Sequence, residues 1–413
     1  MEGRKVPGIR FEGFEEEWEQ RKLGNVTVKI GSGKTPSGGN NAYVDFGITL
    51  IRSQNINDNK VNLLDAVNID VKTDSAMKNS QVYKNDVLLN ITGASIGRSA
   101  VYKGIEHANV NQHVCIIRPN EGYFSEFIQL NLASNNGQRQ IESSQAGGGR
   151  EGLNFQQIGK MCFMFPSMAE QIKIGEYFSA LDHLITLHQR KYKRLKLFKE
   201  SMLNKMFPKD SEKIPEIRFE GFSSDWKQHK LGKIASKITM KNTGSQYIET
   251  FTNSAEFGII SQRDFFDHNV SNIENIEGYY VVEDDVFVYN PRISTSAPVG
   301  PINRNKLGRT GVVSPLYTVF KTHDIDSEYL EWYFKSNHWH LFMYFNGDTG
   351  ARSDRFSIKD SVFFEMPIPI PDIDEQIKIG KYLSKLDSLI TLQQYKMENL
   401  QNFKKSLLEK MFT

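Results

Sequence analysis

The stretch EQIKIGEYFSALDHLITLHQRKYKRLKLFKESMLNKMF, residues 170–207, decides the fold, because EQIKIGKYLSKLDSLITLQQYKMENLQNFKKSLLEKMF repeats it at residues 375–412. A shorter pair precedes them in the same order: IRFEGFEEEWEQRKLGNV at residues 9–26 and IRFEGFSSDWKQHKLGKI at residues 217–234. The two offsets, 205 (375 − 170) and 208 (217 − 9), are nearly equal. They predict two tandem copies of one unit: a domain over 1–165, a helix over 166–208, a second domain over 209–370 and a second helix over 371–413.

The long repeats carry the signals of a helix. Each follows a proline, Pro166 or Pro371, and opens with a capping box, SMAE at residues 167–170 and DIDE at residues 372–375. Apolar residues then recur at steps of three and four, which predicts a coiled-coil seam on each helix. The seam residues are Ile174, Phe178, Leu181, Ile185, Tyr192, Leu195, Phe198 and Met202 in the first helix, and Ile379, Leu383, Leu386, Ile390, Met397, Leu400, Phe403 and Leu407 in the second.

One position of each seam holds a polar residue, His188 in the first helix and Gln393 in the second. The two positions are equivalent, because they are also 205 residues apart (393 − 188). If the helices pack antiparallel, their midpoints meet, and His188 and Gln393 pair and fix the register, as buried polar groups do in coiled coils. In the alternative interpretation, both residues lie on an exposed edge of the seam.

The segments between the repeats have a different character. Short β-rich runs, such as DVLLNIT, HVCIIRP, DVFVYN and PLYTVFK, alternate with Gly, Asn and Pro turns, and FSEFIQLNLAS and SEYLEWYFKS read as helices. Weak correspondences join the two segments, among them Asp86-Val87 with Asp285-Val286. We therefore expect an α/β (mixed α+β) fold, with two similar domains related by a pseudo-twofold internal duplication, each followed by a long helix.

The composition is that of an ordinary globular protein, with 39% hydrophobic and 24% charged residues and a formal net charge of +2. This balance neither requires nor excludes a polyanionic partner. Cys115 and Cys162 lie in apolar runs, which predicts buried free thiols in a reducing compartment rather than a disulfide framework. No apolar run approaches the roughly 20 residues that cross a membrane, and no signal sequence is recognisable. We expect a cytoplasmic protein.

Motifs that carry chemistry in other proteins are incomplete here. GSGKTPSGG at residues 31–39 contains Gly-Lys-Thr, but Val28 stands where a phosphate-binding loop needs glycine. YNPRIS at residues 289–294 lacks the second proline and the aromatic residue of the methyltransferase motif that holds a flipped base. His107 and His113 are six residues apart, which fits neither zinc ligands on one face of a helix nor those of a zinc knuckle. We therefore expect binding rather than catalysis, with no metal and no cofactor held by this chain.

Basic and polar residues do cluster in the loops of both domains. Arg and Asn are the side chains that read guanine and adenine edges, whereas Lys, Ser and Thr bind phosphates. The alternative interpretation is that these are solvated loops. The candidate DNA-binding residues are Lys34, Thr35, Ser37, Arg52, Asn90, Thr92, Ser95 and Arg98 in the first domain, and Asn290, Arg292, Ser294, Thr295, Arg304 and Arg309 in the second.

The whole chain resembles the specificity subunits of type I restriction–modification systems. The resemblance is carried by the IRFEGF and KLG lead-ins, by the two EQIKIG helices, and by loops such as TGASIGRSAVYKG and NPRISTSAPVG. It implies two target-recognition domains, each reading one half of an asymmetric bipartite target in double-stranded DNA. It also implies that the two helices pair as an antiparallel coiled coil and set the unspecified gap between the half-sites.

The resemblance further implies that the partners hold the catalytic machinery. Two methyltransferase subunits would dock on the helices and lead-ins and use S-adenosylmethionine, and two restriction subunits would use ATP and Mg²⁺. The chain itself would be non-catalytic. Two rivals stay open: a fused methyltransferase, against which the missing cofactor motif counts, and a coiled-coil scaffold whose heads bind a ligand other than DNA.

Overall fold

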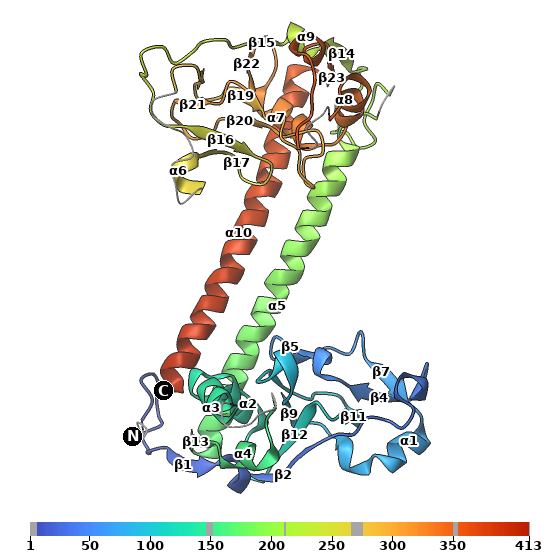
Figure 1. Ribbon diagram of the computed structural model, residues 1–413, viewed down its shortest axis with the longest axis vertical. Helices are drawn as coiled ribbons and strands as arrows, with labels where there is room; N and C mark the ends of the chain where they lie inside the picture. The colour runs from blue at the N-terminus through green and yellow to red at the C-terminus, as the bar shows by residue number, and fades with distance from the viewer. Residues whose placement is uncertain (1–5, 146–151, 210–211, 266–275, 350–353, 413) are drawn as a thin grey trace. The chain divides into compact units, whose positions relative to one another are not determined.

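The computed structural model describes residues 6–145, 152–209, 212–265, 276–349 and 354–412 (Figure 1). The chain forms two compact units, the first from residues 1–189 with 395–413 and the second from residues 190–394. Each unit therefore contains one domain, the first part of the helix that follows it, and the last part of the other helix. The predicted duplication is confirmed, with mixed helix and strand in both copies.

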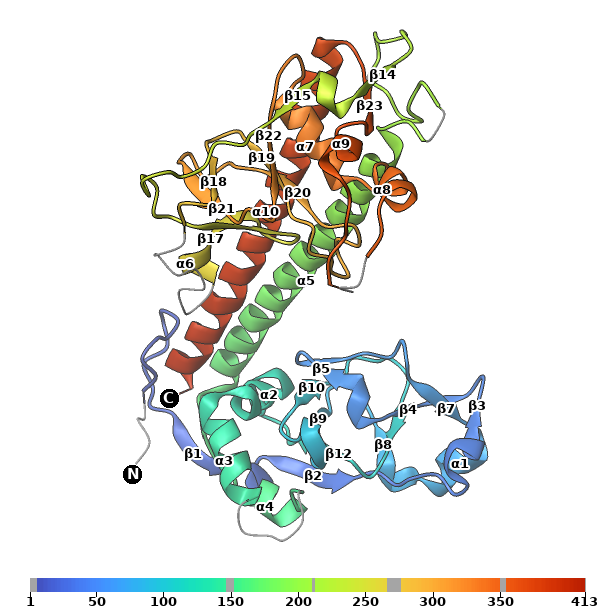
Figure 2. The ribbon, with the colours of Figure 1, turned by 45° about the horizontal axis from the view of Figure 1, so that its top comes forward.

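The first unit is built on two sheets (Figure 2). The four-stranded sheet has the order β10-β9-β12-β2 and is antiparallel, and the five-stranded sheet has the order β3-β7-β4-β11-β8, in which β11 and β4 are parallel. The four-stranded sheet contains two strands predicted from the sequence, DVLLNIT as β9 and HVCIIRP as β12. The strands are β2 (Thr27–Ser32), β3 (Tyr43–Val44), β4 (Ile48–Ile51), β7 (Val67–Ile69), β8 (Gln81–Val82), β9 (Val87–Asn90), β10 (Ser99–Val101), β11 (Ala108–Val110) and β12 (Val114–Pro119).

Short elements complete the first unit. A two-stranded sheet joins β1 to β13, so the lead-in pairs with the segment just before the long helix. The remaining elements are β1 (Glu19–Lys22), β5 (Ile56–Asn57), β6 (Lys60–Val61), α1 (Val71–Ala76), α2 (Ser125–Ala133), α3 (Asn135–Gln145), α4 (Phe155–Lys160), β13 (Cys162–Phe165) and α5 (Met168–Lys205).

The second unit repeats the central sheet of the first. Its order β15-β22-β19-β20 matches β2-β12-β9-β10, and three two-stranded sheets accompany it: β14-β23, β16-β17 and β18-β21. The elements are β14 (Lys227–Lys230), β15 (Ala235–Lys237), β16 (Phe251–Ser254), β17 (Gly258–Ser261), α6 (Gln262–Phe265), β18 (Tyr280–Val282), β19 (Phe287–Tyr289), β20 (Ile302–Arg304), β21 (Gly311–Val313), β22 (Thr318–Thr322), α7 (Ser327–Lys335), α8 (His340–Asn346), α9 (Asp360–Phe363), β23 (Pro367–Ile370) and α10 (Ile373–Met411).

The structure corrects the alignment of the two domains by one residue. The turn before β9 places Asn85 at φ 73°, and the turn before β19 places Asp285 at φ 66°, so Asn85 rather than Asp86 is the equivalent of Asp285. Asn and Asp tolerate this left-handed conformation better than most residues. Asn90 and Asn290 then become equivalent, and each side chain donates a 2.9 Å hydrogen bond to a backbone carbonyl thirty-seven residues earlier in the chain.

The repeated lead-in and the repeated helix are joined by a buried ion pair in each unit. Arg10 donates to both carboxylate oxygens of Glu170 over 2.8 Å, and Arg218 donates to those of Glu375 over 2.7 and 2.8 Å. The Glu170 and Glu375 side chains are fully buried. These hydrogen bonds raise the pKa of Arg10 and Arg218 above its ordinary value. The glutamates predicted as capping-box residues are thus bound by lead-in arginines.

Two further residues of the EQIKIG repeat, Gln171 and Gly175, attach the long helix to the domain. The Gln171 side chain accepts a 3.0 Å hydrogen bond from the N–H of Phe124 and donates one of 2.9 Å to the carbonyl of Pro166. Gln376 makes the same two contacts in the second unit. A Cβ on Gly175 would lie 2.7 Å from the Phe124 ring. Glycine is therefore needed for this close approach of α2 to α5.

Within each unit, the two long helices run antiparallel. In the first unit, Ile174, Phe178 and Leu181 of α5 share a core with residues 407–412. In the second unit, residues 379–386 of α10 share a core with residues 202–207. Both helices are continuous, with 38 and 39 residues, and they lie within the predicted ranges.

The seam prediction is wrong at Phe198 and Phe403. These side chains are 44% and 47% exposed. The next residues, Lys199 and Lys404, take the inward position instead, because the step from Leu195 and Leu400 is four rather than three. Each lysine binds an aspartate of the other helix: Lys199 binds Asp387, and Lys404 binds Asp182 over 2.6 Å.

The polar seam residues differ in burial. Gln393 is 4% exposed, which favours a position inside the seam, whereas His188 is half-buried. Met397 and Leu400 in the first unit and Tyr192 and Leu195 in the second are also half-buried. The proposed pairing of His188 with Gln393 stays a prediction.

The two cysteines have different surroundings. Cys115 is buried in β12, and burial raises the pKa of its thiol to about 12, whereas Cys162 in β13 is partly exposed. Because the thiolate is the reactive form, iodoacetamide at mildly alkaline pH should alkylate Cys162 and spare Cys115 until the protein is unfolded. Mass spectrometry of native and urea-treated protein measures this. The variant Cys162→Ser should stay unmodified when native, and alkylation of its Cys115 would contradict the prediction.

No helix in the described part of the chain is long and apolar enough to span a membrane. Among these same residues, no three His, Cys, Asp or Glu side chains gather in a way that could hold a metal ion. His107, considered above as a ligand, contacts the carboxylate of Asp74 over 3.2 Å.

Candidate nucleic-acid interface

Two of the candidate residues, Asn90 and Asn290, are buried in the domains. Asn90 is 0% and Asn290 is 7% exposed, and both side-chain amides are bound to backbone carbonyls. The Asn290 side chain also accepts a 3.0 Å hydrogen bond from the N–H of Arg292. A base edge cannot reach these amides without displacing the loops, so we assign both asparagines to shaping the loop that follows β9 or β19.

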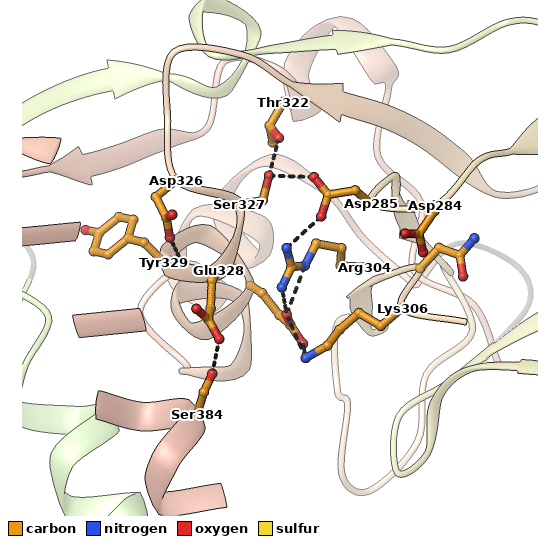
Figure 3. A network of polar contacts seen from close by, with 12 residues as sticks. Asp284, Asp285, Arg304, Lys306, Thr322, Asp326, Ser327, Glu328, Tyr329 and Ser384 are labelled. Carbon is orange, nitrogen blue, oxygen red and sulfur yellow. Dashed lines mark hydrogen bonds and ion pairs between the residues drawn. The ribbon is translucent and has the colours of Figure 1, made fainter. Parts of the chain in front are cut away.

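Arg304 is bound by carboxylates of its own domain (Figure 3). Its guanidinium lies 2.6 Å from Asp285 and donates to Glu331 over 2.8 and 3.0 Å, and its side chain is 13% exposed. Lys306 approaches the same Glu331 carboxylate over 3.4 Å. In Figure 3, Ser327 and Thr322 extend the network beyond Asp285. Arg304 therefore ties β20 to α7, and we leave it out of the proposed interface.

Arg52 and Arg309 also have contacts inside their domains. The Arg52 guanidinium donates to the carbonyl of Asp65 over 3.0 Å and lies 5.9 Å from the centre of the Tyr43 ring. Arg309 donates to both carboxylate oxygens of Glu249 over 2.8 Å, although 47% of its side chain is exposed. Either arginine would have to exchange these contacts to bind a nucleic acid.

In the first unit, the structure brings together Thr35 and Thr92 through Gln112 and His113, which were not among the candidate residues. Thr35 donates to Gln112, the Gln112 amide lies 3.2 Å from the His113 ring, and the other ring nitrogen lies 2.6 Å from the Thr92 hydroxyl. Gln112 is exposed, and glutamine can read adenine through two hydrogen bonds. Lys34, Ser37 and Arg98 are exposed, and Ser95 is half-buried.

In the second unit, the exposed candidates lie on the loop after β19. Arg292, Ser294 and Thr295 are exposed, and this loop pairs with the segment before α9 through a bridge between Arg292 and Arg355. Arg355 was absent from the candidate residues. Its position beside Arg292 depends on a contact between segments more than sixty residues apart, which no local sequence pattern could reveal.

A scaffold used twice, with different exposed side chains at equivalent loops, defines the class: a duplicated recognition protein. The family model described as type I restriction modification DNA specificity domain matches residues 15–197 and 223–402. The chain therefore belongs to this family.

Relatives agree with this assignment. The putative type I restriction enzyme MjaX specificity subunit of Methanocaldococcus jannaschii is 24% identical over 421 residues, which cover 96% of this chain and 93% of the relative. The type I restriction enzyme EcoBI specificity subunit of Escherichia coli is 33% identical over 129 residues, 31% of this chain and 27% of the relative.

Solved structures share the fold. The S subunit of a type I restriction–modification system from M. genitalium has a TM-score of 0.60 at 13% identity, with 99% of both chains covered. A chain from a structure described as the basis of complex assembly and conformational transition of the type I R-M system has a TM-score of 0.53 at 17% identity, covering 97% of this chain and 98% of that one.

Proposed function

We propose that the chain is the DNA sequence-recognition subunit of a type I restriction–modification complex, and that each domain reads one half of an asymmetric bipartite target in double-stranded DNA. The main support is that the specificity-domain match occurs twice while the loop residues differ at equivalent positions, such as the half-buried Thr92 and the exposed Arg292. Equal scaffolds suit one mode of docking on DNA, and unequal loops suit two different half-sites.

The proposed partners are two methyltransferase subunits and two restriction subunits. Each long helix exposes leucines at equivalent positions: Leu184 and Leu187 on α5 are 43% and 45% exposed, and Leu389 and Leu392 on α10 are 38% and 44% exposed. Exposed apolar side chains that recur in this way suit two copies of one partner. In this proposal the chain is non-catalytic, and the partners bind S-adenosylmethionine, ATP and Mg²⁺.

The helices offer a means of fixing the gap between the half-sites. At about 1.5 Å per residue, the 38 residues of α5 extend over about 57 Å, which exceeds one turn of DNA at roughly 34 Å. We propose that this length sets the number of unspecified base pairs in the target.

A methylome tests the proposal. The chain is co-expressed with its proposed methyltransferase partner in a host free of DNA methylation, and methyladenine is mapped by single-molecule sequencing. We expect one two-part asymmetric motif with a fixed gap, present only when this chain is expressed. The same host with the methyltransferase alone is the control. A soluble complex that leaves no methylated motif would contradict the proposal and favour a scaffold whose heads bind another ligand.

A further inference from the structure

Two arginines of the second unit stand directly opposite each other on neighbouring backbone segments. Arg292 follows β19, Arg355 precedes α9, and the two form an antiparallel bridge. One backbone hydrogen bond joins residues 356 and 291 over 2.7 Å, and another joins residues 293 and 354 over 3.0 Å. Arg292 and Arg355 therefore form the non-hydrogen-bonded type of pair, whose Cβ atoms lie closest, at about 4.5–5.5 Å.

The backbone of this bridge is fixed by the core, and its arginine side chains reach the surface. Phe356 is 4% exposed and belongs to the core of the second unit, against which Ile293 also packs. The Asn290 side chain holds the N–H of Arg292. Arg292 is exposed and Arg355 is half-exposed. The domain thus presents two guanidinium groups from one fixed point on its surface.

The pair carries an electrostatic cost. Like charges directly opposite across two strands are destabilising. In the described part of the chain, no carboxylate forms an ion pair with Arg292 or Arg355, whereas Arg218, Arg304 and Arg309 in the same unit are each bound by one or more. An anion between the two guanidinium groups would remove the repulsion.

The first unit shows that the fold does not need these arginines. Its equivalent bridge joins Thr92 to Gly152, and the equivalent backbone hydrogen bond, from Leu153 to the carbonyl of Ile91, is 2.9 Å long. The same backbone arrangement therefore forms with a neutral pair. The two arginines add nothing to this arrangement except charge and hydrogen-bond donors.

We propose that Arg292 and Arg355 together bind one phosphate group of the DNA backbone beside the second half-site; this inference rests on the proposed function. Guanidinium groups match phosphate oxygens with paired hydrogen bonds, and the exposed hydroxyls of Ser294 and Thr295 in the same loop are suited to neighbouring oxygens. A phosphate contact positions the domain on the duplex and carries no sequence information itself.

The test is the salt dependence of DNA binding by the full chain with its co-expressed methyltransferase. Affinity is measured for the duplex target from the methylome and for a random-sequence duplex, between about 50 and 200 mM salt. In the double variant Arg292→Gln/Arg355→Gln, the slope of log affinity against log salt should become shallower by about 1 on both duplexes. The double lysine variant should keep the slope but bind more weakly, because lysine lacks the paired donors.

A matched control removes two other positive charges from the same unit. Lys321 and Lys230 are exposed and bound to Glu283 and Glu365, so Lys321→Gln/Lys230→Gln should leave the slope unchanged. An unchanged slope of log affinity against log salt in the arginine variant overturns the phosphate site, whether or not the base preference is lost. Absence of any preference for the target in the wild type would instead contradict the proposed function. Thermal melting confirms that each variant folds.

Discussion

Replacement of Arg218 by alanine should destabilise the second unit by about 3–5 kcal/mol, because it leaves the fully buried Glu375 carboxylate without its charged partner. Arg10→Ala should do the same in the first unit through Glu170. Chemical denaturation with hydrogen exchange read separately in each unit measures both effects. The loss should be confined to the unit that carries the substitution.

Two controls make this result specific. Lys213 and Asp225 form an ion pair in which both side chains are mostly exposed, so Lys213→Ala should change stability little. Replacing Arg218 and Glu375 together by methionine removes both charges and should cost far less than Arg218→Ala, because no buried charge is left unpaired. A loss below about 1 kcal/mol for Arg218→Ala would contradict the assigned role of the ion pair.

Exchange of the first domain for the equivalent domain of a relative should replace one half-site completely. An exchange of residues 30–160 would cut inside β2, which pairs with β12, so the junctions are better placed at Val26 and Met161. The repeats, the Arg10–Glu170 ion pair and the pairing of β1 with β13 then stay intact. Methylome sequencing should show one altered half-site, an unchanged second half-site and the same gap.

The reciprocal exchange in the second domain is the control, and it should alter the other half-site only. Simultaneous change of both half-sites after a single exchange would show that the domains do not read independently. A changed gap would show that the helices do not set it.

The sequence predicted the scaffold well because the scaffold is periodic and repeated. The helices, the strands DVLLNIT and HVCIIRP, and the duplication all depend on local patterns. The seam failed where local counting was ambiguous: Phe198 and Lys199 both fit a step from Leu195, and the apolar residue is the exposed one. There, an ion pair with Asp387 decides the helix face, and that contact is tertiary.

The candidate interface was less predictable, because residue type does not reveal burial. Asn90 and Arg304 have the chemistry of base-reading residues, yet one is fixed to a backbone carbonyl and the other to two carboxylates. Gln112 is adjacent to His113, which was considered only as a metal ligand. The repeats offered a better signal for structural contacts. Arg10 and Arg218 recur at matching positions, and so do Glu170 and Glu375, as expected of residues that form the same ion pair in both units.

The lysines at the helix seam have a consequence for the direction in which the helices can pair. Lys199 and Lys404 are equivalent positions, and so are Asp182 and Asp387. A parallel, in-register alignment would place lysine against lysine and aspartate against aspartate, whereas the antiparallel alignment places each lysine on an aspartate. Four charged residues thus disfavour the parallel arrangement, which the apolar seam alone would permit.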